Sequence, residues 1–183
     1  MRLNPFGSGW KRFRTVADTA TAKPIEKRVV LDLDRCIGCK SCMAACFYGH
    51  KELHGVEFVD LGPALLPVVC RQCADPACVE TCPAEAMVRD AEGVVARAMF
   101  HCRSCGSCVR ACPFGVLSLE KVGHQIAKCD LCQDRLARGL EPRCVAVCPT
   151  RALRFATTAE IEADGLTVLG GRVAGEHPIR RRL

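Results

Sequence analysis

The reactive chemistry of this chain is concentrated in its cysteines, which are numerous and regularly spaced. There are 16 of them among 183 residues. They fall into four groups of four with none left over, and each group begins with two cysteines separated by two residues. The groups are Cys36-x2-Cys39-x2-Cys42-x3-Cys46, Cys70-x2-Cys73-x4-Cys78-x3-Cys82-Pro83, Cys102-x2-Cys105-x2-Cys108-x3-Cys112-Pro113 and Cys129-x2-Cys132-x11-Cys144-x3-Cys148-Pro149. Thiolates at these spacings are typical ligands of iron–sulfur clusters or of zinc.

The spacing within groups one and three favours cubane clusters. Both follow the run C-x2-C-x2-C-x3-C of bacterial ferredoxins. Three thiolates at intervals of three residues on a tight loop reach three corners of one cubane, and the N–H groups of the loop point at the sulfurs. Gly38, Gly106 and Ser107 keep these loops small. The fourth cysteine of such a run ligates the neighbouring cluster, so sixteen thiolates predict four [4Fe–4S] clusters.

Zinc sites and disulfides explain the pattern less well. A structural zinc site uses two cysteine pairs, so a third cysteine close behind and a fourth followed by proline would have no role in it. The longest apolar run, residues 61–69, is broken by two prolines, and the N-terminus shows no apolar stretch typical of a secretory signal. We therefore expect a cytoplasmic protein without a membrane span, where disulfides would not persist.

The segments between the cysteine groups predict the elements that position them. Residues 83–101 predict two short strands about a turn at Asp90–Gly93. Residues 113–128 show a weaker form of the same pattern, with a turn near Glu120–Gly123. The spacer 47–69 is longer and predicts an irregular loop.

The two outer ends of the cysteine region look complementary. An alternating strand at 28–34 precedes group one, and a second strand at 152–156 follows group four. A ferredoxin pairs such first and last strands, so the expected fold is α/β (α+β), with two intertwined ferredoxin-like modules of two [4Fe–4S] clusters, one inserted in the other. Spacing alone also allows groups one and two to pair, and three and four. The expected organisation is an N-terminal arm at 1–26, a four-cluster domain at 27–156 (inner module about 68–116, outer module 27–67 plus 117–156) and a tail at 157–183 with a short helix near Ala159–Ala163.

Three motifs carry a resemblance to a known family. They are Asp34-Arg35-Cys36-Ile37-Gly38-Cys39, the C-x2-C-x2-P-x-C element at 70–78, and Lys128-Cys129-Asp130-Leu131-Cys132 followed by 144–153. Over about residues 27–156 the chain resembles the four-cluster iron–sulfur subunits of molybdenum and tungsten oxidoreductase complexes. That family includes the formate dehydrogenase beta and dimethyl sulfoxide reductase iron–sulfur subunits and the small subunits of aldehyde oxidoreductases.

The resemblance implies which cysteines share a cluster. The four implied ligand sets are Cys36, Cys39, Cys42 and Cys148; Cys46, Cys129, Cys132 and Cys144; Cys70, Cys73, Cys78 and Cys112; and Cys82, Cys102, Cys105 and Cys108. Some relatives replace a cysteine of group three and hold a three-iron cluster. Cys105 is present in this chain, so four cubane sites are expected.

The remaining residues offer no catalytic site, so we expect a non-catalytic protein. Residues 7–12 lack the third glycine of a dinucleotide fingerprint, and residues 170–172 lack the Gly-Lys-Ser/Thr of a P-loop. Among the five histidines, His50 and His54 have metal-like spacing but are better explained as solvated, and His101 as a plain neighbour of Cys102. The chain has 26 Lys+Arg against 20 Asp+Glu, a formal charge of +6. Four oxidised clusters with their thiolates add about −2 each, which changes +6 into about −2 and disfavours nucleic-acid binding.

The predicted function is an electron-transfer subunit that relays single electrons through its clusters. The expected partner is a pterin-containing catalytic subunit, a tungsten or molybdenum aldehyde or formate oxidoreductase, with a flavin/NAD subunit or soluble ferredoxin as acceptor. A relay subunit of a hydrogenase or carbon monoxide dehydrogenase, and a free-standing structural or regulatory iron–sulfur protein, are the alternatives. Copies could also associate in series. The arm with Phe6, Trp10 and Phe13 is either a plain terminus or a docking segment for a partner or another copy.

Overall fold

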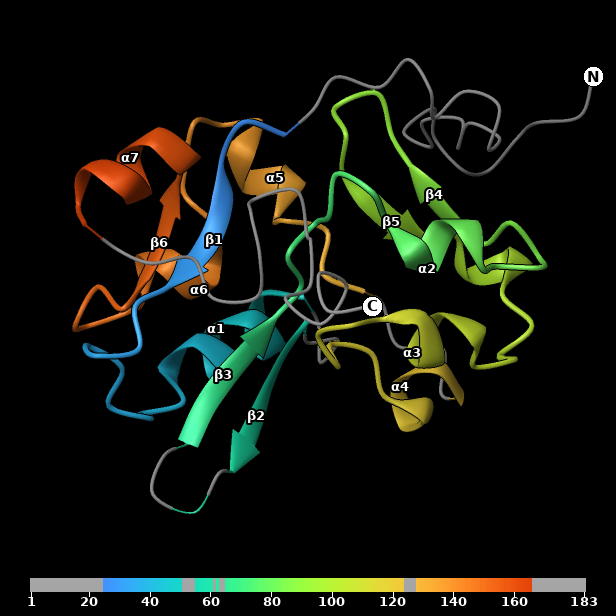
Figure 1. The fold of residues 1–183 in the computed structure, drawn as a ribbon, viewed down its shortest axis with the longest axis horizontal. Helices are drawn as coiled ribbons and strands as arrows, with labels where there is room; N and C mark the ends of the chain where they lie inside the picture. The colour runs from blue at the N-terminus through green and yellow to red at the C-terminus, as the bar shows by residue number, and fades with distance from the viewer. Residues whose placement is uncertain (1–24, 51–54, 61, 63–64, 124–127, 166–183) are drawn as a thin grey trace, which may run out of the picture.

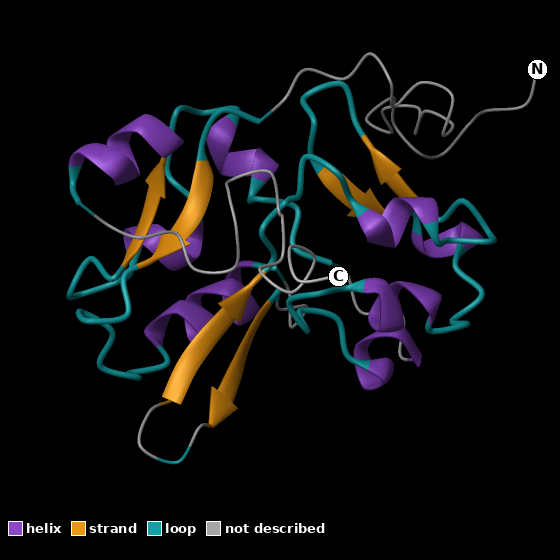
Figure 2. Cartoon of the chain, viewed as in Figure 1, coloured by secondary structure: helices purple, strands orange, loops and turns teal. Residues whose placement is uncertain are grey.

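The computed structural model describes residues 25–50, 55–60, 62, 65–123 and 128–165. Nearly all of the predicted arm at 1–26, and the tail beyond residue 165, lie outside these residues. The strands in the described part form three separate two-stranded antiparallel sheets with short helices around them (Figure 2). Within the described ranges, no helix is long and apolar enough to cross a membrane.

The first sheet joins the two ends of the cysteine region, as predicted. Strand β1, Arg28–Leu31, pairs with β6, Leu153–Ala156, in a register that places Arg28 opposite Ala156 and Leu31 opposite Leu153. Figure 1 shows these two strands side by side, although one is blue and the other orange-red. The strand at 28–34 ends earlier than predicted because the Asp32 side chain accepts a hydrogen bond from the N–H of Asp34 at 3.1 Å and turns the chain.

The hairpin predicted within 83–101 is also present. Strands β4, Met87–Arg89, and β5, Val95–Arg97, pair antiparallel. The Asp90 carboxylate accepts a hydrogen bond from the N–H of Val94 at 2.8 Å, and Gly93 takes a left-handed φ of 84°. The turn therefore lies at the predicted residues.

Two of the predictions for spacers are wrong. The spacer at 47–69 is not an irregular loop, because β2, Val56–Asp60, and β3, Leu65–Val69, form a hairpin. Proline disfavours a strand, but Pro67 sits opposite Phe58 in a sheet of only two strands, where an outward-facing nitrogen needs no partner. The second error is the turn near Glu120–Gly123. The chain forms helix α4, Leu119–Gly123, there, because Leu, Glu and Lys favour a helix and Glu120 lies in its first turn.

Short helices carry many of the cysteines and pack in pairs. Helix α1, Ser41–Gly49, packs against α6, Arg143–Ala146, and α2, Ala77–Glu80, packs against α3, Ser107–Ala111. In Figure 1 the first pair lies on the side of β1 and β6, and the second pair on the side of β4 and β5. The remaining helices are α5, Gln133–Leu136, the 3-10 helix η2, Met99–His101, and α7, Thr158–Ala163, which confirms the short helix predicted near Ala159–Ala163.

Candidate metal centres

All four C-x2-C loops share one backbone feature that brings their thiols together. The residue directly before the second cysteine adopts a left-handed conformation in every loop. These residues are Gly38, Gln72, Ser104 and Leu131, with φ of 65°, 48°, 55° and 60°. Left-handed backbone costs a residue with a side chain about 1–2 kcal/mol, so three of the four loops are strained. Strain of this kind, repeated at four equivalent positions, marks a functional constraint on the loops.

The C-x3-C spacing places cysteines one helical turn apart, and facing helices bring two such pairs together. Cys42 and Cys46 are both buried on α1, whereas Cys144 lies on α6 and Cys148 just beyond its end. Since α1 packs on α6, electrostatic contacts link the thiol of Cys42 with Cys148 and the thiol of Cys144 with Cys46. Each helix therefore offers one thiol to each of two neighbouring groups of sulfurs.

The second helix pair repeats this arrangement. Cys78 lies on α2 with Cys82 after it, and Cys108 lies on α3 with Cys112 after it. The thiol of Cys78 interacts with Cys112, and the thiol of Cys108 interacts with Cys82. The C-x2-C loops then add further thiols. The contacts with loop cysteines are Cys42 with Cys39, Cys46 and Cys144 with Cys132, Cys78 with Cys70 and Cys73, Cys108 with Cys102, and Cys129 with Cys144.

The thiols thus gather into four neighbourhoods that match the sets implied by the family resemblance. Cys36 and Cys105 belong to them through their loops, which they share with Cys39 and Cys102. Two contacts cross between neighbourhoods. The thiol of Cys144 interacts with that of Cys42, and the thiol of Cys129 with that of Cys70.

Two cavities coincide with two of these neighbourhoods. A cavity of about 480 Å³ is lined by the four thiols of Cys70, Cys73, Cys78 and Cys112. A smaller one of about 140 Å³ is lined by those of Cys46, Cys129, Cys132 and Cys144. Four convergent thiols around a cavity are the donor set that an iron–sulfur cubane requires, so the residues fit the predicted group.

The acidity of the buried thiols also suits a metal. Burial raises the pKa of Cys42 to about 11, and burial raises the pKa of Cys78 and of Cys144 to about 12. Thiols of this kind stay protonated at neutral pH on their own, whereas a coordinated thiol is deprotonated outright. These sites are therefore stable as thiolates only when a cation shares them.

Hydrogen bonds to sulfur occur at both buried and exposed thiols. Backbone N–H groups donate to four of the sulfurs at 3.2–3.4 Å: Gly55 to Cys46, Ala86 to Cys82, Ser104 to Cys102, and Leu153 to Cys148. The exposed thiols of Cys39 and Cys105 each lie 3.4 Å from a serine hydroxyl, Ser41 and Ser107. The hydrogen bond with that serine lowers the pKa of each thiol. Such donors stabilise negative charge on sulfur, as expected from the sequence.

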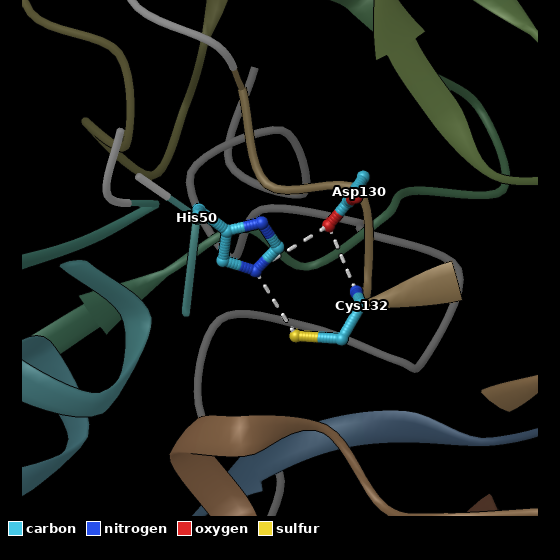
Figure 3. Close-up of side chains that lie close together, drawn as sticks. All are labelled: His50, Asp130 and Cys132. Carbon is cyan, nitrogen blue, oxygen red and sulfur yellow. Dashed lines mark hydrogen bonds and ion pairs between the residues drawn. The ribbon is translucent and has the colours of Figure 1, made fainter. Parts of the chain in front are cut away.

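His50 contacts a metal-site thiol that lies far from it in sequence (Figure 3). Its Nε2 is 3.3 Å from the Cys132 sulfur and 3.9 Å from an Asp130 oxygen, and that oxygen accepts a hydrogen bond from the Cys132 N–H at 2.8 Å. The hydrogen bond with Cys132 raises the pKa of His50. Burial opposes ionisation of Cys132, but hydrogen bonds from His50 and Arg143 leave the pKa of this thiol lowered. Sequence reasoning treated His50 as solvated and missed this contact. His54 lies outside the described residues, and His101 is exposed.

Two buried polar side chains near the sulfurs were also missed. Gln72 is 2% exposed; its amide donates to the carbonyl of Cys129 at 2.7 Å and its oxygen accepts from the N–H of Val95 at 2.8 Å. Lys128 is 8% exposed, and its Nζ donates to the carbonyl of Val95 at 2.5 Å. Both residues lie inside the cysteine motifs, which was the available signal, but nothing in the motifs indicates burial.

Comparison with known proteins connects this geometry to iron–sulfur chemistry. Residues 63–158 match the family model of the 4Fe-4S dicluster domain, and residues 29–49 match that of the 4Fe-4S binding domain. Similar proteins include the nitrate-inducible formate dehydrogenase iron-sulfur subunit of Escherichia coli strain K12, with 33% identity over 72% of this chain and 54% of the relative. The B subunit of the anaerobic dimethyl sulfoxide reductase of the same strain shares 34% identity over 72% of this chain and 73% of the relative. A formate dehydrogenase iron-sulfur subunit of Haemophilus influenzae shares 29% identity over 81% of this chain and 57% of the relative.

The chain thus spans about half the length of the formate dehydrogenase subunits that it matches and about three quarters of the dimethyl sulfoxide reductase subunit. The predicted family and the predicted [4Fe–4S] cofactors are confirmed. Proteins of this type transfer electrons within oxidoreductase complexes and are not catalytic themselves, as expected from the sequence.

Proposed function

The chain belongs to the 4Fe-4S dicluster family, together with the iron–sulfur subunits of formate dehydrogenase and dimethyl sulfoxide reductase, and we propose that it relays single electrons between a catalytic subunit and an acceptor. The observation that carries the proposal is the gathering of sixteen thiols into four neighbourhoods of four, with contacts across their borders. Each [4Fe–4S] cluster, when bound, supplies a one-electron couple.

The proposed ligand sets are those implied by the family resemblance. They are Cys36, Cys39, Cys42 and Cys148 (set I); Cys46, Cys129, Cys132 and Cys144 (set II); Cys70, Cys73, Cys78 and Cys112 (set III); and Cys82, Cys102, Cys105 and Cys108 (set IV). The thiol contacts support this assignment over the pairing of group one with group two. Contacts join group one with group four and group two with group three.

The two-module architecture is part of the proposal. The pairing of β1 with β6 and of α1 with α6 supports an outer module at 27–67 plus 117–156. The β4–β5 hairpin and the packing of α2 on α3 support an inner module at about 68–116, inserted within it. The arm at 1–26 remains a proposed docking segment. The cytoplasmic location also remains a prediction.

The protein's own residues hold the sets in place and adjust the charge around them. The left-handed loops aim thiols inward, and N–H groups and serine hydroxyls donate to sulfur. The contacts between sets I and II and between sets II and III place the sets in the order I, II, III, IV, and the exposed thiols of Cys39 and Cys105 belong to the two end sets. We propose that a pterin-containing tungsten or molybdenum subunit, acting on an aldehyde or formate, meets one end and that a flavin/NAD subunit or ferredoxin meets the other. Association of copies in series would use the same two ends.

The test is anaerobic purification of the tagged chain with whatever subunits accompany it. We expect about 16 iron and 16 sulfide per chain, and a co-purifying large subunit that contains tungsten or molybdenum. The Cys105→Ser variant should change one cluster signal and slow electron transfer while partner binding persists. Ala137→Ser, which places the same hydroxyl at an exposed position away from the sulfurs, is the matched control.

Two outcomes would contradict the proposal. Stoichiometric zinc without iron would remove the relay altogether. Full electron transfer in the Cys105→Ser variant after loss of that cluster would show that set IV is not on the path. A large subunit of hydrogenase type would keep the relay and replace the proposed partner.

A further inference from the structure

Lys128 is a buried cation that lies between two of the thiol sets. It is the charged side chain shared by the two cavities, since it lines the cavity of set III and also that of set II. Its side chain hydrogen-bonds the thiol of Cys70 and interacts electrostatically with Cys78 of set III and Cys129 of set II. The two sets adjoin at this point, because the thiols of Cys70 and Cys129 interact with each other.

The surrounding structure holds the ammonium group in this position. Nζ donates to the carbonyl of Val95 at 2.5 Å and to that of Cys129 at 3.3 Å. Gln72 braces the same region from its other side, through hydrogen bonds to the carbonyl of Cys129 and the N–H of Val95. Strand β5, the loop before Cys73 and the loop at Cys129 are thereby tied together around one charge. A side chain this buried cannot exchange its position with solvent.

Other charged groups near these sulfurs interact with the thiols of one set each. Arg28 interacts with Cys70 and Cys73, both of set III. Arg71 interacts with Cys73 and Cys112, again of set III, and stacks its guanidinium on Phe114 with 4.2 Å to the ring centre. On the side of set II, Asp130 faces Cys46. Arg143 and His50 face Cys132 of the same set. Arg97 lines the smaller cavity and interacts with Cys108 of set IV.

We propose that Lys128 is a positioning residue that favours the reduced state of both central clusters, those of sets II and III, and holds their potentials above the values their thiolates alone would set. The inference rests on the proposed function. Its physical basis is that reduction adds one negative charge to a site, and a buried positive charge beside that site stabilises the added charge with little screening. Because Lys128 faces both sets, one substitution should move two potentials.

The experiment is a redox titration of the full chain with its partner, followed by electron paramagnetic resonance. Lys128→Met removes the charge at similar length. We expect two of the four reduction steps to shift to lower potential, each by at least tenfold in the reduction equilibrium, which is 59 mV for a one-electron couple. The other two steps should stay in place. Lys128→Arg, which keeps the charge, should leave all four near their original values.

Lys40 offers a matched control, since it adjoins Cys39 as Lys128 adjoins Cys129 but is exposed. Lys40→Met removes the same charge from a screened position, so no step should move by as much as tenfold. Equal shifts in the two methionine variants would overturn the proposal, as would a shift in Lys128→Arg as large as that in Lys128→Met. A Lys128→Met protein with four reversible steps at unchanged potentials would refute the inference while leaving the proposed relay intact. Absence of iron from the unmodified chain would instead refute the relay.

A measurement on the unmodified protein covers the case in which Lys128→Met does not assemble its clusters. Protein labelled with ¹⁵N-lysine should show a nitrogen hyperfine coupling on a reduced cluster, because Nζ lies within hydrogen-bonding distance of a sulfur ligand. The coupling should vanish in Lys128→Arg, which carries no lysine nitrogen there. Absence of the coupling from the unmodified protein would refute the geometry on which the inference depends.

Discussion

Replacing Gly55 with alanine should disturb one metal centre through a displacement of less than one ångström. A Cβ at this position would lie 2.8 Å from the Cβ and 3.0 Å from the Cα of Cys129. Carbon atoms in contact are normally about 3.5–4.0 Å apart, so the loop would have to retreat by roughly 0.7 Å. The N–H of Gly55 donates to the sulfur of Cys46 at 3.2 Å. The same retreat would stretch that hydrogen bond to about 3.9 Å, where little of it remains.

The cost has two parts. Overpacking against the backbone of a neighbouring segment costs about 1–3 kcal/mol, and the lost hydrogen bond about 1 kcal/mol more. For a chain of this size, 1 kcal/mol lowers the midpoint of thermal unfolding by about 2–4 °C, so the Gly55→Ala protein should melt roughly 4–16 °C lower. In addition, a thiolate that loses a donor is less stabilised when reduced, so the set II cluster should shift to lower potential.

The assay is anaerobic calorimetry with a redox titration of the same samples. Gly123→Ala is the matched control, because a Cβ there meets nothing within 4 Å and the position lies in helix α4, where alanine is favoured. We expect Gly123→Ala to keep its melting temperature and all four potentials. If Gly55→Ala is indistinguishable from that control, the close approach of Gly55 to Cys129 is not the constraint described above.

Four further outcomes are expected. Burial raises the pKa of Cys78 and of Cys144 to about 12, so these thiols hold protons in the iron-free protein and lose them on binding iron. Cluster loading should therefore release protons and strengthen as pH rises, measured as a calorimetric heat that changes with the ionisation enthalpy of the buffer; a buffer-independent heat would contradict this. Removal of iron by a chelator should abolish the far-ultraviolet dichroism of the helices, and a preserved spectrum would mean that the polypeptide folds alone. Ser41→Ala and Ser107→Ala each remove a hydroxyl donor from an exposed thiol, so each should lower the potential of a different end cluster, and a shift of the same cluster by both would refute the assignment. Thr157→Ala removes the capping box of α7 and should cost about 1 kcal/mol in calorimetry without changing the iron content.

The parts of the site that follow from local spacing were predictable from sequence. Cysteines four residues apart lie on one face of a helix, and cysteines three apart lie on one loop. The strand pairing at the two ends was predictable for the same reason, since the alternating residues from Arg28 and from Leu153 each expose one apolar face that needs a partner.

The parts that depend on contacts between distant segments were not predictable. Pro67 disguised strand β3, because proline is excluded only from strands with two neighbours, and the number of neighbours is a tertiary property. The approach of His50 to Cys132 joins residues that are 82 apart, and that of Lys128 to Val95 joins residues 33 apart. Left-handed Gln72 and Leu131 were equally hidden, because sequence rules assign that conformation to glycine.

The thiols and the core of this protein are largely the same atoms. The helices have four to nine residues and the sheets have two strands each, and elements of this size are marginal in water without packing. Aromatic residues make up only 5% of the chain, so large side chains supply little of that packing. Instead, buried cysteines stand among the valines and leucines of both apolar clusters, Cys42, Cys46 and Cys144 in one and Cys108 in the other. In the proposed ligand sets each of these thiols also ties its helix to a distant segment, so one bond to iron would do the work of both a core contact and a cross-link. It follows that a ligand substitution in a buried set should cost folding as well as a cluster, whereas one at exposed Cys39 or Cys105 should cost mainly the cluster.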